Sequence, residues 1–213
     1  ADGAPRVDPR RRGLRGDLDF AAVATENNET ISCRGTGWVK VGSTVQQDST
    51  WQEDMWVRQH DGSNINPTFS WTSSVGCNSR RWLLRDANVS DFLGFDASNS
   101  GSGATHSTTG QNTTADKSRV MYLDHAEANT ALATPSGWTE NFDAGSATGP
   151  YRLAVGGKNV STSGSGSGDI SVTGAAASWV QRQIEILAAV AQTQRQEAEN
   201  SGAGPDNYSV DTE

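Results

Sequence analysis

Histidine and carboxylate side chains are the groups of this chain that could carry acid–base chemistry. His125 follows Asp124 directly, and Glu127 lies two positions later. A Ser/His/Asp hydrolase also needs its serine on a strained Gly-x-Ser-x-Gly turn that opens a helix. The nearest lookalike, residues 164–168, belongs to a Gly/Ser run that is typical of a flexible turn. We therefore predict that His125 lies at a strand end, faces water and takes no part in catalysis.

Paired carboxylates would be the signature of glycoside hydrolysis, which needs two carboxyl groups at a fixed separation across a cleft. Glu53 and Asp54, with Asp61 nearby, are the candidates. Adjacent strand residues point to opposite faces, so Glu53 and Asp54 cannot face one substrate together. Asp61, Asn64 and Asn66 match no complete calcium loop, so they predict an Asx-rich turn.

The remaining histidines and the cysteines are isolated along the chain. His60 begins a turn, and His106 stands in a Ser/Thr-rich stretch with no neighbour to tune it. Scattered histidines and two isolated cysteines, Cys33 and Cys77, do not make a metal site, which needs clustered ligands. We favour two reduced, half-buried thiols. A disulfide between Cys33 and Cys77 is the alternative, because the distance and orientation of the two residues in the fold decide whether a bond can form. The sequence predicts no enzyme activity, no cofactor and no metal.

Seven tryptophans are many for a chain of 213 residues. Four recur at matching positions of the two halves and are predicted to be core residues: Trp38, Trp82, Trp138 and Trp179. Trp51, Trp56 and Trp71 occur in the first half only, and Trp51 and Trp56 fall on opposite faces of one regular strand. Exposed aromatic rings stack on sugars or anchor protein interfaces. These three are therefore candidates for core, subunit-contact or glycan-binding positions.

Residues 1–16 form a Pro/Arg-rich segment without alternation, which predicts an extended basic arm. Its arginines are Arg6, Arg10, Arg11, Arg12 and Arg15. The whole chain carries a net charge of −8, and phosphate binding needs a basic surface, so no nucleic-acid partner is expected. Because the planar guanidinium pairs well with carboxylates, we predict that the arm grips a neighbouring protein subunit.

The elements that position these residues are predicted to be strands. Period-two alternation runs through 17–24, 51–58 and 180–186, bounded by Gly, Ser, Asn and Asp clusters. The stretch 96–117 is nearly devoid of apolar residues and predicts a crossing loop with one edge strand around 104–110. Helix-forming residues from 188 to 200, followed by an acidic segment, predict a short helix and an irregular tail over 188–213.

Composition limits the core to a thin layer. Only 34% of residues are hydrophobic and the mean hydropathy is −0.60. This suits a two-sheet sandwich, in which each strand gives every second side chain to the interior. No apolar run approaches the length of a membrane span, so no membrane partner is expected.

The two halves of the chain carry the same landmarks in the same order, at an offset of roughly 100 residues. Each half has an apolar strand, a Gly-Trp pair (Gly37-Trp38 and Gly137-Trp138), a second strand and a closing Trp-containing strand. Self-similarity of this kind predicts one domain, residues 17–187. Its two diverged copies cover about 17–95 and 117–187.

Several short motifs resemble a known pattern. They are Gly16-Asp17-Leu18, Thr36-Gly37-Trp38, Thr134-Pro135-Ser136-Gly137-Trp138-Thr139, and the Gly-Ala-Ala-Ala run before the last strand. The first copy departs from it, with Cys33-Arg34-Gly35-Thr36 in place of Pro-Ser. Over about residues 16–188 the chain resembles the duplicated, jelly-roll-like β-sandwich modules of tailed-phage virion proteins and bacterial surface proteins. The resemblance implies an all-β, antiparallel, jelly-roll-like two-sheet sandwich in a virion or surface setting, and it implies no catalytic residue.

We therefore expect a bacteriophage structural protein on the virion surface, of the capsid decoration or cement type. Its terminal arms would bind other virion proteins, such as the major capsid protein or head or tail subunits. A homo-oligomer is expected, with a trimer favoured. The first alternative is a tail-fibre or adhesin-type module that binds a host glycan or receptor, and the second is a secreted polysaccharide-active protein.

Overall fold

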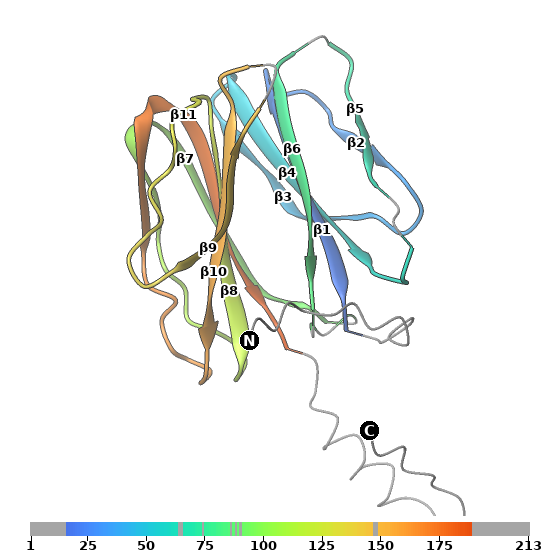
Figure 1. The fold of residues 1–213 in the computed structure, drawn as a ribbon, viewed down its shortest axis with the longest axis vertical. Coiled ribbons are helices and arrows are strands. Elements are labelled where there is room, and N and C mark those ends of the chain that lie inside the picture. The colour runs from blue at the N-terminus through green and yellow to red at the C-terminus, as the bar shows by residue number, and fades with distance from the viewer. Residues whose placement is uncertain are drawn as a thin grey trace, which may run out of the picture.

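The computed structural model describes residues 16–188, apart from 64–65, 74, 86, 88, 90 and 147–148. Within these residues every regular element is a β-strand, and every strand pairing is antiparallel. Two large sheets face each other, with a small two-stranded sheet outside the first (Figure 1). The all-β, antiparallel prediction is confirmed. The described residues contain no helix that could cross a membrane.

Each large sheet comes from one continuous part of the chain. The first has the order β3-β4-β1-β6, formed by Val39–Gln47, Trp51–Gln59, Leu18–Glu26 and Cys77–Leu84. The second has the order β7-β11-β8-β10-β9, formed by Leu93–Thr108, Ile170–Ile186, Ser118–Ala126, Arg152–Val160 and Thr139–Gly145. The small sheet pairs β2 (Ser32–Arg34) with β5 (Thr68–Ser70).

This strand order differs from that of a jelly roll. A jelly roll contains two Greek keys, in which three successive hairpin-connected strands lie side by side and the fourth lies beside the first. In chain order, the four main strands of the first sheet have the spatial order 2-3-1-4 instead. The jelly-roll expectation is therefore not supported by the topology.

The main core fills the space between the two sheets. Alternation in β1 sends Phe20 and Ala22 inward, where they meet Met121 and Leu123 of β8 and Ile184 of β11. All five side chains are almost completely buried. The main core is thus a layer between the sheets, and a second buried cluster lies on the outer face of the second sheet.

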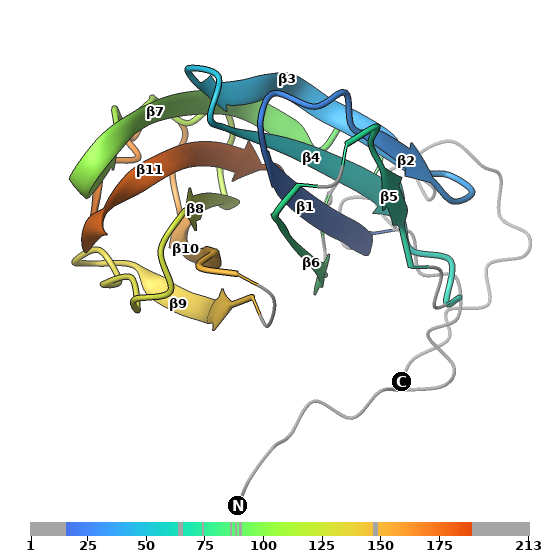
Figure 2. The ribbon, with the colours of Figure 1, turned by 90° about the horizontal axis from the view of Figure 1, so that it is seen from above.

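The outer faces of both sheets are also covered. The β2–β5 sheet lies over the first sheet (Figure 2). In the segment before β2, the Glu29 backbone carbonyl accepts a hydrogen bond from the Gln52 side chain of β4. On the second sheet, Leu132 and Trp138 pack against Tyr122 of β8. Strands β1, β4 and β8 are consequently buried on both faces. Such strands hold polar side chains in places that sequence alone suggests are exposed.

The crossing loop predicted at 96–117 is largely a strand, which is a correction. β7 runs over Leu93–Thr108 as an edge strand paired with β11. The register of the β7–β11 pairing shifts between Thr173 and Ala177 of β11, and the two-stranded ribbon bends there. The bend lets Asn99 donate a hydrogen bond to the Ser107 carbonyl of the same strand. The far half of the ribbon therefore folds back over the outer face of the second sheet (Figure 2).

The described ends of the sandwich meet. The Ala87 amide donates to the Gly16 carbonyl, and Ala87 forms an isolated bridge with Ala188. β1 therefore begins and β11 ends at the same end of the sandwich, the lower one in Figure 1. Of the predicted arm (residues 1–16) and the predicted tail (188–213), residues 1–15 and 189–213 lie outside the described residues.

Candidate functional site

A groove opens between the two sheets at the end of the sandwich where β1 begins and β11 ends. Its volume is about 860 Å³, and its walls are the end of β6, the start of β8, part of β9, and the ends of β10 and β11. On the other side of the sandwich β3 lies close to β7. In Figure 2, β6 faces β10 and β9 across a wider separation. The groove is therefore the open end of the space between the sheets.

The floor of the groove is the rim of the main core. Met121 and Ile186 belong to the buried cluster, and Trp82 and Phe142 pack against it while half-buried themselves. The Trp82 and Phe142 rings lie 6.0 Å apart, and Trp82 also stacks on Phe20 at 5.8 Å. An apolar partner laid over these rings would complete the core at this end.

Cationic side chains border this apolar floor. Arg119 of β8 reaches across the second sheet, and its guanidinium donates to the side-chain oxygens of Asn159 at 3.5 Å and Asn141 at 3.2 Å. No carboxylate among the described residues pairs with it. Arg85 and Lys117, both exposed, line the same groove. In a chain with a net charge of −8 this is a local concentration of positive charge.

A glycine holds Arg119 in place. A Cβ added at Gly157 of β10 would come within 2.9 Å of Arg119 Nε and 3.0 Å of Arg119 Nη2. The guanidinium therefore lies flat against the bare backbone of Gly157, and its Nε is buried without a hydrogen-bond partner in the described part of the chain. Such a positioned guanidinium, bonded only to neutral amides, is suited to a carboxylate.

The groove also borders an unpaired strand edge. Among the described strands, β6 pairs with β1 alone, and Trp82, Leu83 and Leu84 of β6 line the groove. An edge strand offers free backbone donors and acceptors to an added strand. The groove thus combines an apolar floor, a cationic border and a strand edge, which together suit an extended, acidic peptide.

His125 is not exposed, which corrects the prediction that it faces water. It does lie near the end of β8, but it is completely buried, and its Nδ1 is 2.6 Å from Glu53 Oε2. Glu53 also accepts from Arg182 Nε at 3.1 Å, and Arg182 Nη1 reaches Asp96 Oδ2 at 2.5 Å. These polar residues connect β4 of the first sheet to β8, β11 and β7 of the second. Their role is to join the sheets.

The ionisation of this cluster follows from its partners. Burial would raise the pKa of Glu53, but the contacts with His125 and Arg182 outweigh burial and hold that pKa below its ordinary value. Burial raises the pKa of Asp96 despite its contact with Arg182. Glu53 faces His125 and Arg182, whereas Asp54 pairs with Lys40 at 2.7 Å, so the two carboxylates point to opposite faces as predicted.

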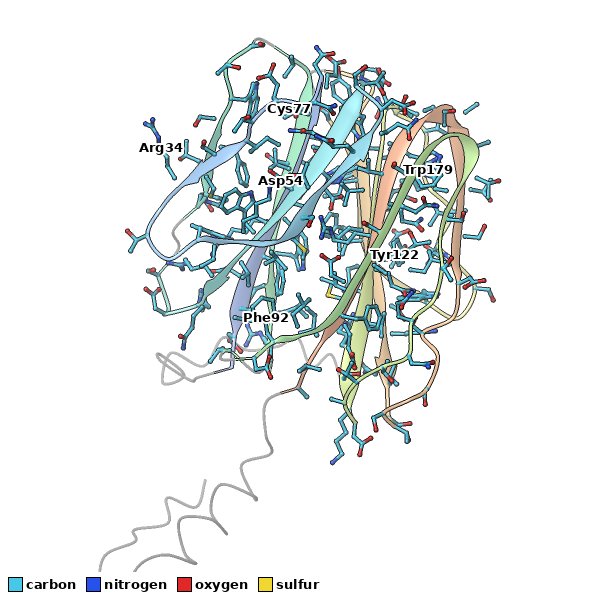
Figure 3. The ribbon with its side chains drawn as sticks, turned by 180° about the vertical axis from the view of Figure 1, so that it is seen from behind. Arg34, Asp54, Cys77, Phe92, Tyr122 and Trp179 are labelled. Carbon is cyan, nitrogen blue, oxygen red and sulfur yellow. The ribbon has the colours of Figure 1, made fainter. Side chains whose placement is uncertain are left out.

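His106 has close neighbours, contrary to the prediction that it has none. It is fully buried on the outer face of the second sheet, with Nδ1 2.8 Å from Asp124 Oδ1 and its ring stacked 5.1 Å from Trp179. Gln181 donates to the same carboxylate at 2.9 Å. Figure 3 shows Trp179 and Tyr122 on this half of the molecule and Asp54 on the other. This cluster fastens the folded-back ribbon to the sheet.

A third polar cluster ties the loop after β4 to the first sheet. Asp19, almost completely buried, accepts from Arg58 at 3.0 Å and Arg81 at 2.7 Å and lies 3.1 Å from His60 Nδ1. Burial would raise the pKa of Asp19, but hydrogen bonds from His60, Arg81 and Arg58 hold it below its ordinary value. Asp61 lies in the turn that follows β4, as predicted, while Asn64 lies outside the described residues.

The tryptophans divide by burial. Trp51 is completely buried and stacks on Tyr151 at 5.2 Å, so its ring offers no surface to a ligand in this fold. Trp56, on the opposite face of the same strand, and Trp71 are half-buried. Neither lines the groove described above. Of the four recurring tryptophans, Trp38 and Trp179 are buried, while Trp82 and Trp138 are half-buried.

Cys33 and Cys77 are free, half-buried thiols, so the preferred interpretation is confirmed over the disulfide. Burial raises the pKa of Cys33 to about 11 and raises that of Cys77 as well. Thiols of this kind are poor nucleophiles at neutral pH. Among the described residues, no group of three or more His, Cys, Asp and Glu side chains is arranged to hold a metal ion.

Neither Arg119 nor the groove was predicted from the sequence, and Trp82 was predicted as a core residue because it recurs. A signal was present, since Lys117 and Arg119 are two cations directly before the apolar run of β8 in an acidic chain. The five arm arginines, Arg6, Arg10, Arg11, Arg12 and Arg15, lie outside the described residues.

Comparison with known proteins identifies no relative. No protein-family model, no curated protein and no solved structure matches the chain.

Proposed function

We propose that this protein is a structural component of a bacteriophage virion surface, of the capsid decoration or cement type. It binds neighbouring virion subunits through its terminal arms and through the open groove. The observation that carries the proposal is the meeting of Gly16, Ala87 and Ala188 beside that groove. The described chain therefore begins and ends at one end of the sandwich, beside the open rim of its core.

The buried chemistry supports a scaffold. His106 and His125 are each bound to a buried carboxylate, and His60 is tied to Asp19. The carboxylates of these pairs connect strands and loops and do not line the groove. The residue types that could carry acid–base chemistry are thus used to hold the fold, which favours a non-enzymatic role.

We also propose that the two sheets are diverged copies of one unit. In chain order, β1, β3, β4 and β6 have the same spatial order in the first sheet as β8, β9, β10 and β11 in the second. Gly37 and Gly137, before the matching Trp38 and Trp138, have φ of 83° and 79°. The landmarks of the sequence repeat therefore fall on corresponding elements, with β7 as an additional edge strand.

The glycan-binding alternative has less support. It relies on exposed rings, yet Trp51 is completely buried and neither Trp56 nor Trp71 lines the groove. A polysaccharide-active protein would need two carboxylates across a cleft, and no acidic residue lines the groove in the described part of the chain. The lining of the groove and the burial of Trp51 therefore favour a structural role over these two alternatives.

The test is the mass of the purified protein in solution. We expect an oligomer, with a trimer favoured, that dissociates when residues 1–15 are deleted or when all five arm arginines are replaced by glutamine. The control is Arg34→Gln, which removes one exposed arginine of β2 and should leave the mass unchanged. A full-length monomer that the deletion does not affect would overturn the proposal and direct attention to glycan screening with Trp56→Ala.

A further inference from the structure

We infer that the groove receives an extended segment of another virion protein, which pairs with the edge of β6 opposite β1 and carries an acidic residue two positions before an apolar one. Both side chains point from one face of the segment toward the second sheet. The inference rests on the proposed function, because it gives the chemistry of the partner that the groove contacts.

The apolar and cationic parts of the groove lie on one face of β8. Met121 and Arg119 are two positions apart in this strand, so both side chains point toward the first sheet. Met121 belongs to the main core, and Arg119 continues the same row at the groove. A strand laid over the groove therefore meets both groups with the side chains of one of its own faces. Its acidic and apolar residues must be two positions apart and not adjacent.

The order of these two partner residues follows from the strand pairings. Arg119 pairs with Ile186 of β11, whereas Met121 pairs with Ile184. Arg119 therefore lies nearer the end of the sandwich where β11 ends, the lower one in Figure 1. β6 runs toward the same end, since it is antiparallel to β1. A partner strand antiparallel to β6, which is the more stable kind of pairing, enters from that end with its acidic residue first.

The guanidinium of Arg119 is positioned to receive this carboxylate. It lies across Gly157 of β10, where an added Cβ would come within 2.9 Å of Nε, and it extends to Asn141 of β9. Glycine inside a strand often marks a close approach to the backbone, which the guanidinium makes here. In the described part of the chain, two of its five N–H donors are used, both by neutral amide oxygens. A carboxylate is the acceptor that a planar guanidinium binds most strongly.

The surrounding charges favour the same partner. Lys117 lines the groove and has a φ of 57°, a left-handed backbone that few residues other than glycine adopt. Arg85 lines the groove as well, and no acidic side chain does so among the described residues. The groove therefore attracts an acidic segment and repels a basic one.

The edge of β6 supplies partners for the backbone of the segment. Among the described strands β6 pairs with β1 alone, and four consecutive residues from Trp82 to Arg85 line the groove. Leu83 is 38% exposed, one of two large hydrophobic side chains classed as exposed in the described part of the chain. An added strand would cover Leu83 on one face of the sheet and Trp82 on the other. Main-chain hydrogen bonds supply affinity in this mode of recognition, and side-chain pockets supply specificity.

Peptides of identical composition test the pattern on the full chain. Acetyl-Thr-Thr-Asp-Thr-Phe-Thr-Thr-amide places Asp and Phe on one face of a strand, whereas acetyl-Thr-Thr-Thr-Asp-Phe-Thr-Thr-amide places them on opposite faces. Titration followed by NMR, using the amide signals of β6 and the indole signal of Trp82, gives each Kd. We expect the first peptide to bind at least about tenfold more tightly and to shift these signals. A third peptide with the order Phe-Thr-Asp should bind more weakly than the first.

The charge is tested on both partners. Asparagine in place of the aspartate of the first peptide, or Arg119→Gln in the protein, should each weaken binding by about tenfold. Combining the two changes should weaken it little further, because they remove the same contact. The control Arg34→Gln, at an exposed arginine of β2, should leave the Kd unchanged. The asparagine peptide tests the same contact if Arg119→Gln fails to fold.

Two kinds of result would overturn the inference. One is the absence of binding by the first peptide at millimolar concentration. The other is an affinity that does not change with the position or the charge of the aspartate.

The mass of the same protein separates this inference from the proposed function. An arm-dependent oligomer that does not bind the first peptide would refute the groove partner and leave the structural role intact. A monomer that is unaffected by deletion of residues 1–15 and does not bind the peptide would refute both.

Discussion

Glu53 is a completely buried carboxylate whose charge is matched by residues from the opposite sheet. It lies 2.6 Å from His125 Nδ1 and accepts from Arg182 Nε. Removing one member of a buried ion pair leaves the other charge without compensation and typically costs about 3–5 kcal/mol. Such a cluster contributes little net stability relative to an apolar core, but it specifies how the sheets face each other.

We therefore expect Glu53→Gln to lower the free energy of unfolding by about 3 kcal/mol, because buried Arg182 would keep only Asp96 as a carboxylate partner and buried His125 would lose the Glu53 carboxylate. Urea denaturation followed by tryptophan fluorescence measures this change. The matched control is Glu140→Gln, an exposed position of β9 whose substitution should change the free energy by less than about 0.5 kcal/mol. Equal effects at the two positions would contradict the structural role of the cluster.

The same residue predicts how stability depends on pH. The folded-state pKa of Glu53 is held below its ordinary value near 4.5, so the folded state favours the ionised carboxylate. Its contribution is fully present above pH 4.5 and is lost as the pH falls through the folded-state pKa. Asp19, whose pKa is also lowered, acts in the same direction, while Asp96, whose pKa is raised, opposes it.

We expect the urea midpoint of the wild-type chain to fall between pH 5 and pH 3, and the difference between wild type and Glu53→Gln to shrink over that range. Midpoints measured at half-unit pH intervals for both proteins provide the comparison. A difference that stays constant with pH would mean that Glu53 contributes to stability by packing and not by its charge.

The loops before β3 and β9 each contain a glycine with a positive φ. Gly37 and Gly137 both precede a tryptophan that begins the approach to an edge strand, and both have a left-handed backbone. Such φ values favour glycine, since a Cβ there meets the following carbonyl. At Gly37 an added Cβ would also lie 3.3 Å from Arg58 Cγ, whereas at Gly137 it would meet nothing within 4 Å.

We predict that Gly137→Ala lowers the free energy of unfolding by about 1 kcal/mol and that Gly37→Ala lowers it by more. The additional loss at Gly37 arises because Arg58 must shift while it holds Asp19. Thermal and urea denaturation give both values. Gly166→Ala, at an exposed position without a left-handed backbone, should have little effect; the reverse ranking would refute the assignment of matching turns.

At the scale of elements, the sequence predicted those strands in which apolar and polar residues alternate. The interpretation of 17–24, 51–58 and 180–186 as strands is confirmed by β1, β4 and β11. β7 was predicted mainly as a loop because Ser, Asn and Gly dominate it and few of its side chains are buried. β7 pairs with β11 through backbone hydrogen bonds, which any residue type can make. Such pairing therefore produces no alternation of apolar and polar residues in the sequence.

The histidines were misplaced for a related reason. A half-buried sheet was assumed, so a polar residue in a strand was assigned to solvent. β8 is buried on both faces, because the other sheet covers one and the loop around Leu132 covers the other. Its near-continuous apolar run from Val120 to Leu123 was the available indication. The groove itself depends on how the sheets separate at one end, which no local pattern encodes.

At the scale of the whole molecule, the two sheets share the core that stabilises them. Met121 of the second sheet packs in one cluster with Phe20 and Met55 of the first, and all three are almost completely buried. Neither sheet alone would cover these side chains. The sandwich should consequently unfold as one cooperative unit, although each sheet derives from a separate part of the chain.

We predict that Met121→Ala lowers the free energy of unfolding by about 3 kcal/mol and speeds hydrogen exchange in β1 and β4 as much as in β8 and β10. Hydrogen exchange followed by mass spectrometry, under conditions where exchange occurs by global unfolding, resolves the two sheets separately. Leu132→Ala is the matched comparison, because Leu132 is equally apolar and buried but packs only on the outer face of the second sheet. Its effect should be smaller and should be greatest near the loop that it anchors. If Met121→Ala accelerated exchange in the second sheet alone, the two sheets would be independent units, and the shared core would not be what joins them.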